Sequence, residues 1–134
     1  MPKILSAYAA TAITLLALDL LWLGVIAKPL YQQGIGHLMA DKPNIPVALL
    51  FYAVFAAGLL WFAVLPGAAA ASWGRTLGTA ALFGFLCYAT YDLSNLATLK
   101  AWPWSLSLLD MAWGTSVSAL SSAAGKLALD RLSA

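Results

Sequence analysis

The chain has 134 residues, of which 63% are hydrophobic and only 9% are charged, and its formal net charge is +2. Soluble domains carry about 25% charged residues, so the polar residues present here cannot cover a surface that faces water. The composition therefore excludes a soluble globular domain and a disordered chain, and the single cysteine excludes a disulfide framework. The scattered lysines and arginines argue against nucleic-acid binding, which leaves an integral membrane protein embedded in the lipid bilayer.

Four segments contain the roughly 20 apolar residues that a helix needs to cross a bilayer. We predict a single all-α transmembrane domain, a four-helix bundle, because each helix satisfies its own backbone hydrogen bonds in lipid. The first segment is too long for the core of a signal peptide and contains Asp19, so we interpret it as a retained span. The predicted spans cover about residues 4–27, 45–65, 76–99 and 103–127.

The second span is the most apolar, and we expect it to face lipid and to end at the Pro66-Gly67 pair. Between the first two spans, residues 28–43 carry apolar side chains at near-helical spacing, which predicts a short interfacial helix. Anchoring at the membrane surface is the ordinary role of tryptophan near span ends. We assign that role to Trp61, Trp73, Trp102 and Trp104.

The basic residues give the orientation. Cytoplasmic loops carry an excess of lysine and arginine, and a topology with both termini in the cytoplasm places four of the seven basic residues on that side. Those four are Lys3, Arg75, Lys126 and Arg131, against Lys28, Lys42 and Lys100 outside.

Three of the five acidic residues, Asp19, Asp92 and Asp110, lie inside the predicted spans. Each would cost about 2.5–3.5 kcal/mol at the centre of a spanning helix, so their presence in so apolar a chain requires a reason. Asp19 lies nine residues before Lys28, and Asp92 lies eight residues before Lys100. Asp110 lies eight residues after Trp102. Because consecutive spans alternate in direction, the rise per residue places all three carboxyl groups about 12–14 Å below one interface.

The surroundings of these aspartates repeat. Trp22 and Trp113 each follow an aspartate by three residues, on the same helical face, and Asn95 takes the equivalent place after Asp92. No lysine or arginine shares this layer, so some of the carboxyl groups should be protonated at neutral pH unless a cation is bound. The candidate ligand- or ion-binding residues are Asp19, Trp22, Tyr88, Tyr91, Asp92, Asn95, Asp110 and Trp113.

An oxygen-rich layer of this kind suits a proton, a hard metal ion or an organic ammonium group, to which the aromatic rings add cation–π attraction. The alternative is that the aspartates only hydrogen-bond one helix to another. Small residues of the last span fit either a polar track leading away from this layer or close helix packing, and they are Ser118, Ser121, Ser122 and Gly125. We interpret His37 as a surface group and Cys87 as a small core residue.

Several stretches around these residues resemble a known family. They are Asp19-Leu-Leu-Trp22-Leu-Gly24, Pro43-Asn44 with Phe51-Tyr52, Tyr88-Ala-Thr-Tyr91-Asp92-Leu-Ser-Asn95-Leu-Ala-Thr98 and Asp110-Met-Ala-Trp113-Gly114. Over nearly the whole chain they resemble the small bacterial membrane proteins called domain of unknown function twenty-one seventy-seven. The resemblance implies a multi-pass, four-span protein of the bacterial inner membrane and carries no settled activity with it.

Three functions fit these observations. The first is a buried carboxylate site that binds or translocates a proton, a metal ion or a small amine, with a homo-oligomer supplying the alternating halves that so short a chain lacks. The second is a noncatalytic membrane subunit that binds a lipid or another hydrophobic ligand. The third is a metal-dependent enzyme acting on lipid, which is weaker because no histidine or nucleophile lies in the layer. The sequence identifies no catalytic residue and leaves the metal and any cofactor open.

Overall fold

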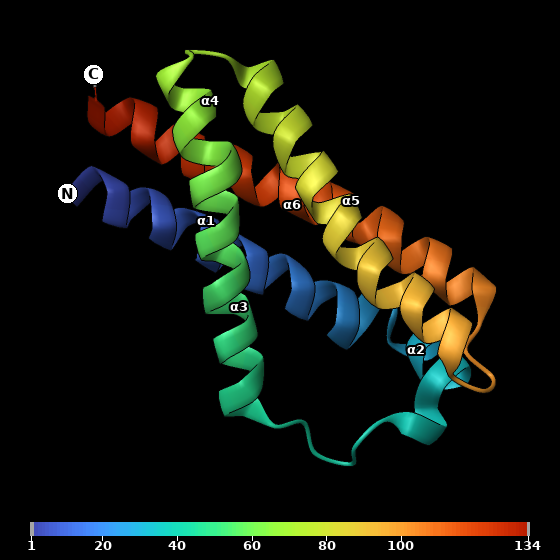
Figure 1. Ribbon diagram of the computed structural model, residues 1–134. Helices are drawn as coiled ribbons and strands as arrows, with labels where there is room; N and C mark the ends of the chain where they lie inside the picture. Colours follow the sequence, from blue (N-terminus) through green and yellow to red (C-terminus); the bar gives the residue numbers. More distant parts are fainter. Residues whose placement is uncertain (1, 134) are drawn as a thin grey trace.

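The computed structural model describes residues 2–133, and every regular element within them is helical, which confirms the all-α prediction (Figure 1). The short helix α2 lies where the sequence predicts an interfacial helix. The elements in chain order are α1 (Pro2–Leu21) with the π-helical turn η1 (Trp22–Ile26), α2 (Lys28–Ile35) with the 3-10 turn η2 (Gly36–Leu38), α3 (Ile45–Leu59), the π-helical turn η3 (Leu60–Val64), α4 (Leu65–Ala69), α5 (Trp73–Thr98) and α6 (Trp104–Ser133).

Two of the long helices are apolar enough throughout to cross a membrane. They are the continuous helix Pro2–Ile26, made of α1 and η1, and the continuous helix Ile45–Ala69, made of α3, η3 and α4. Helices α5 and α6 have 26 and 30 residues, which is sufficient length for a span, but they carry more polar side chains. The four-span topology therefore stays a prediction.

From the sequence we expect the second long helix to end at the Pro66-Gly67 pair. It continues instead to Ala69. A proline inside a regular α-helix lacks a hydrogen-bond donor, and its ring clashes with the carbonyl group four residues earlier. Pro66 is the second residue of α4, one residue beyond η3, and the wider π-helical turn before it accommodates its ring. The chain reverses only at Ala71, whose φ of 52° marks the turn into α5.

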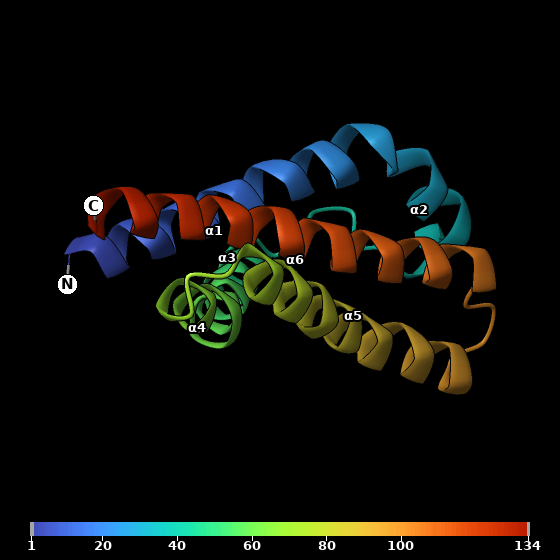
Figure 2. The ribbon, with the colours of Figure 1, turned by 90° about the horizontal axis from the view of Figure 1, so that it is seen from above.

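Helix α6 lies between α1 and α5 and packs along both of them (Figure 2). Small residues permit this close approach, since a Cβ atom on Gly84 of α5 would overlap the Ser118 side chain of α6. Ser118, Ser121 and Ser122 are all fully buried in the contact. Close helix packing therefore explains why the residues at these positions of α6 are small, while the hydroxyl groups of the three serines have no hydrogen-bond partner within residues 2–133.

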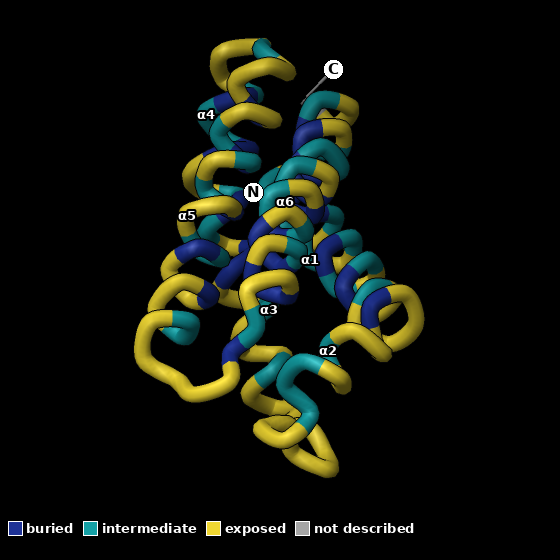
Figure 3. Tube along the Cα trace, turned by 90° about the vertical axis from the view of Figure 1, so that its right-hand side faces the viewer, coloured by how far each residue is buried: buried dark blue, intermediate teal, exposed yellow. Residues whose placement is uncertain are grey.

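Helix α3 crosses α1 at a steep angle, and its first half diverges from α5 (Figure 1). Where the four long helices meet, Leu15, Phe55, Leu59 and Val117 form the centre of a hydrophobic core. Figure 3 shows the buried positions gathered at these contacts, whereas α2 is exposed or half-buried along its length. Large apolar side chains cover the outward faces of the long helices, as lipid contact requires.

Candidate functional site

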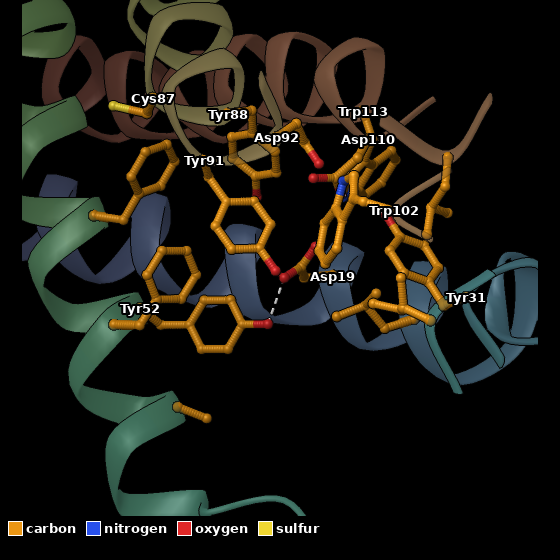
Figure 4. Close-up of a pocket in the computed structure, with 16 residues that line it drawn as sticks. Asp19, Tyr31, Tyr52, Cys87, Tyr88, Tyr91, Asp92, Trp102, Asp110 and Trp113 are labelled. Carbon is orange, nitrogen blue, oxygen red and sulfur yellow. Dashed lines mark hydrogen bonds between the residues drawn. The ribbon is translucent and has the colours of Figure 1, made fainter. Parts of the chain in front are cut away.

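A cavity of about 460 Å³ lies where the end of α1, the start of α3, the end of α5 and the start of α6 come together, with α2 beside them (Figure 4). Its volume falls within the usual range of small-molecule sites. Every one of these five helices contributes side chains to its wall. The lining residues are Asp19, Leu23, Tyr31, Ile35, Ala48, Phe51, Tyr52, Phe55, Cys87, Tyr88, Tyr91, Asp92, Trp102, Leu106, Asp110 and Trp113.

Asp19, Asp92 and Asp110 all line this cavity, although they come from three different helices. Asp19 is 4% exposed, Asp92 is 1% exposed and Asp110 is 8% exposed. No lysine, arginine or histidine is among the lining residues. The cavity is therefore an acidic compartment whose walls offer no fixed positive charge.

Asp19, on α1, accepts a hydrogen bond at each of its carboxylate oxygens. The phenol of Tyr52 on α3 donates to Oδ2, and the indole Nε1 of Trp113 on α6 donates to Oδ1 over 2.7 Å (Figure 4). Donors of this kind stabilise an ionised carboxylate in a site that water barely reaches. Asp19 is thus a buried hydrogen-bond acceptor that ties α1 to two other helices.

Asp110, on α6, accepts one hydrogen bond, of 2.5 Å, from the phenol of Tyr31. Tyr31 belongs to α2, outside the predicted spans, and its oxygen in turn accepts a hydrogen bond of 3.2 Å from Nε1 of Trp22. Burial, followed by the hydrogen bond to Asp110, raises the pKa of the Tyr31 phenol well above its ordinary value. Tyr31 therefore stays a hydrogen-bond donor to Asp110 at any physiological pH.

The two tryptophans that follow aspartates by three residues stack on each other. The ring centroids of Trp22 and Trp113 lie 4.5 Å apart with an interplanar angle of 4°. Trp113 lines the cavity, while Trp22 stands behind it and supports Tyr31. The Asp-x-x-Trp repeat of the sequence thus forms one pair of stacked indoles, from η1 and α6.

Asp92, on α5, differs from the other two aspartates because no side chain within residues 2–133 donates a hydrogen bond to it. Its Oδ2 is fully buried and has no partner among the residues that the structure describes. Figure 4 shows its carboxyl group facing that of Asp110 across the cavity wall. Two carboxyl groups in this position can form a hydrogen bond only when one of them holds a proton.

The remaining candidates from the sequence divide into those that reach the cavity and one that does not. Tyr88 and Tyr91 both line it, and Tyr88 is held in place by Gly114, where a Cβ atom would overlap the Tyr88 ring. Asn95 is half-buried and does not line the cavity. Trp102 lines it instead, from the loop after α5, with its ring edge-on to Tyr91 at 5.8 Å between centroids.

Three cavity residues escape the sequence reasoning. Trp102 is 9% exposed and donates a hydrogen bond of 2.9 Å from Nε1 to Oγ of Ser107, so its assignment as a membrane-surface anchor is wrong. Tyr52 belongs to the span that we expect to face lipid, and Tyr31 belongs to the interfacial segment. Tyr52 belongs to a stretch that carries the family resemblance, and Tyr31 lies among polar residues of the interfacial segment, but neither signal reveals the direction in which the side chain points.

The aspartates do not form an evident metal centre. Within residues 2–133, no three side chains of histidine, cysteine, aspartate or glutamate come close enough together to hold one metal ion. Asp19 uses both of its oxygens for hydrogen bonds from Tyr52 and Trp113, which leaves fewer lone pairs free for a metal. The donor set therefore fits a hard metal ion poorly.

Long helices with apolar outward faces, packed around a buried acidic cavity, define this chain as a helical membrane protein. Residues 4–127 match the family described as "predicted membrane protein (DUF2177)", and the chain belongs to this family. The match confirms the resemblance drawn from the aspartate motifs. No curated protein and no solved structure matches the chain.

Proposed function

We propose that this protein binds a small organic cation, an amine or quaternary ammonium compound, in the acidic cavity within the membrane. The observation that carries the proposal is that Asp19, Asp92 and Asp110 line one cavity from which lysine, arginine and histidine are absent. A buried anion needs a compensating charge, and the chain provides none here. A cation that enters the cavity supplies that charge.

The walls favour an organic cation over a bare metal ion. Aromatic rings form much of the lining, including Tyr88, Tyr91 and Trp113, and such rings attract ammonium groups through cation–π interactions. Aliphatic and phenyl side chains such as Leu23, Phe51 and Phe55 complete the lining and suit the hydrocarbon part of the ligand. A hydrated metal ion would gain little from these groups.

The proposed setting is a four-span protein of the bacterial inner membrane with both termini in the cytoplasm. In that topology, the cavity lies toward the outer face of the membrane, below α2 and the segment that joins α2 to α3. Binding needs one copy of the chain, because all the lining residues belong to it. Passage of the cation across the membrane would require a second opening, and we propose that a homo-oligomer provides it.

The test is a binding titration with the protein purified in detergent. Tetraalkylammonium ions of increasing size, from tetramethylammonium to tetrabutylammonium, are titrated calorimetrically at constant ionic strength, with sodium as the reference cation. We expect saturable binding of at least one tetraalkylammonium ion and none of sodium. Asp19→Asn removes the negative charge of the carboxyl group to which Tyr52 and Trp113 donate. The variant should therefore bind the ion about tenfold more weakly, or weaker still.

Asp41→Asn is the matched control, because Asp41 is an exposed acidic residue of the α2–α3 connection and does not line the cavity. It should bind as the wild type does. If no tetraalkylammonium ion binds, or if Asp19→Asn binds as tightly as Asp41→Asn, the cavity is not a cation site.

A second candidate, binding of an uncharged lipid or hydrophobic ligand, is favoured by the apolar part of the lining, to which Leu23, Ile35 and Leu106 contribute. Such a ligand would not depend on the carboxyl groups. Lipid that copurifies with the wild type and with Asp19→Asn in equal amounts would support this function. Loss of the copurified compound from Asp19→Asn would support the cation site.

A further inference from the structure

The three carboxyl groups of the cavity accept different numbers of hydrogen bonds, and this difference indicates which of them is protonated. Resting on the proposed cation site, we infer that Asp92 carries an exchangeable proton, which leaves the cavity when a cation binds. The protein would therefore exchange one proton for each monovalent cation. Asp19 and Asp110 hold the negative charge, and Asp92 changes its charge.

The hydrogen bonds assign the proton to Asp92 rather than to its neighbours. Asp19 accepts bonds from Tyr52 and Trp113, and Asp110 accepts one from Tyr31, so both have donors that stabilise the ionised form. Asp92 has no donor, although it is the most deeply buried of the three at 1% exposed. A neutral carboxyl group tolerates that environment, whereas an anion would stand unsolvated and opposite another anion.

A proton on Asp92 also gives that carboxyl group a partner. As a neutral acid, Asp92 has one O–H group, and the Asp110 carboxyl that it faces is an acceptor. The pair then shares a single negative charge. This arrangement leaves the three-carboxyl compartment with two charges rather than three.

The groups that face Asp92 from the neighbouring helices do not provide a competing positive charge. The titratable lining residues are Asp19 from α1, Tyr31 from α2, Tyr52 from α3 and Asp110 from α6, together with Cys87, Tyr88 and Tyr91 of its own helix. All of these are neutral or negative in their ordinary forms. Ionised Asp92 therefore becomes stable only when a cation occupies the cavity.

The exchange step balances in atoms and charge. The O–H bond of the Asp92 carboxyl breaks, its electron pair stays on the carboxylate oxygen, and the proton passes to water. The incoming cation brings one positive charge as the proton removes one. The electrostatic energy of the cavity therefore changes little when a monovalent cation replaces the proton.

The experiment is a calorimetric titration of the wild type with the tetraalkylammonium ion that binds most tightly, in buffers of different ionisation enthalpy. A permanent cation is used because it cannot itself gain or lose a proton. We expect about one proton released per cation bound, and an apparent affinity that rises about tenfold per pH unit while Asp92 is protonated in the free protein. Asp92→Asn should release no proton and show an affinity independent of pH.

Asp19→Asn is the matched variant, since it should bind the cation more weakly while still releasing the proton of Asp92. An infrared difference spectrum of the wild type alone gives a second readout, independent of variant folding. The carbonyl band of a protonated carboxylic acid should disappear when the cation is added. Cation binding without proton release, or with an unchanged infrared band, overturns the exchange but leaves the cation site standing, whereas absence of binding at every pH removes both proposals.

Discussion

The two ends of the helical bundle hold buried charge in opposite ways. At the end away from the cavity, the Lys126 side chain is 4% exposed, and its ammonium group lies 2.5 Å from Oδ2 of Asp130 and 4.6 Å from the ring centroid of Trp73. At the cavity end, three aspartates are surrounded by phenols, indoles and apolar side chains. The first end neutralises its charge within the chain, so it is complete as folded. In the function that we propose, the second end is complete only when a proton or cation is added.

The most direct way to break this contrast is to fill the cavity end. Gly114→Leu places a side chain where even a Cβ atom overlaps Tyr88, so we expect a loss of about 3 kcal/mol in the free energy of unfolding and no cation binding. Gly78→Leu is the control, because a Cβ atom at Gly78 meets nothing within 4 Å. Unfolding monitored by circular dichroism in detergent should separate the two variants. Equal stability of the two would mean that the packing of Tyr88 against α6 does not hold the cavity wall.

A second prediction compares one aspartate from each end. Asp130→Asn leaves the buried Lys126 without its partner and should lower the free energy of unfolding by about 1 kcal/mol, less than for a fully buried pair because Asp130 is partly exposed. Asp92 accepts no hydrogen bond from a side chain that the structure describes, and in the variant a neutral amide, whose N–H can still donate to Asp110, replaces a neutral acid, so stability should be unchanged or slightly higher. Unfolding curves at pH 7 check both. A loss in Asp92→Asn as large as that in Asp130→Asn would show that the Asp92 carboxyl group makes stabilising contacts that a neutral amide cannot replace.

The smallest expected effect concerns Tyr31 at alkaline pH. The pKa of the Tyr31 phenol in the folded protein is raised above the ordinary value of 10.0. Tyr31 therefore contributes its full stabilisation below pH 10, and this contribution is lost as the pH rises above 10. At about pH 10.5, the wild type should have lost about 0.8 kcal/mol more, relative to neutral pH, than Tyr31→Phe. If the free energies of unfolding of the two proteins changed with pH in the same way, Tyr31 would not stay protonated as a donor to Asp110 in the folded protein.

The sequence is sufficient to predict features that depend on helix geometry alone. The constant rise per residue places Asp19, Asp92 and Asp110 at one depth, and in the structure all three line one cavity. The three-residue spacing places Trp22 and Trp113 on the same face as their aspartates, and the two rings stack. These inferences need only the helical repeat and the alternation of direction along the chain.

Features that depend on how helices meet sideways are not predictable in this way. Tyr52 reaches Asp19 because α3 crosses α1, and Tyr31 reaches Asp110 because α2 folds back toward α6. Trp102 is followed by a proline and lies near a span end, which is typical of a surface anchor, yet its ring is buried. In each case the aromatic side chain finds a buried hydrogen-bond partner whose position only the tertiary arrangement defines.

Helix α2 contains no buried residue, yet Tyr31 at its centre supplies the phenol that donates to Asp110. The segment that a topology diagram would draw as an external connection is therefore part of the ligand pocket. A trimmed version of the protein that keeps the long helices but replaces residues 28–38 with a flexible linker would lose a wall of the cavity and the partner of one carboxylate. Comparisons among relatives should for the same reason weigh this segment with the helices, since changes in ligand preference can arise there.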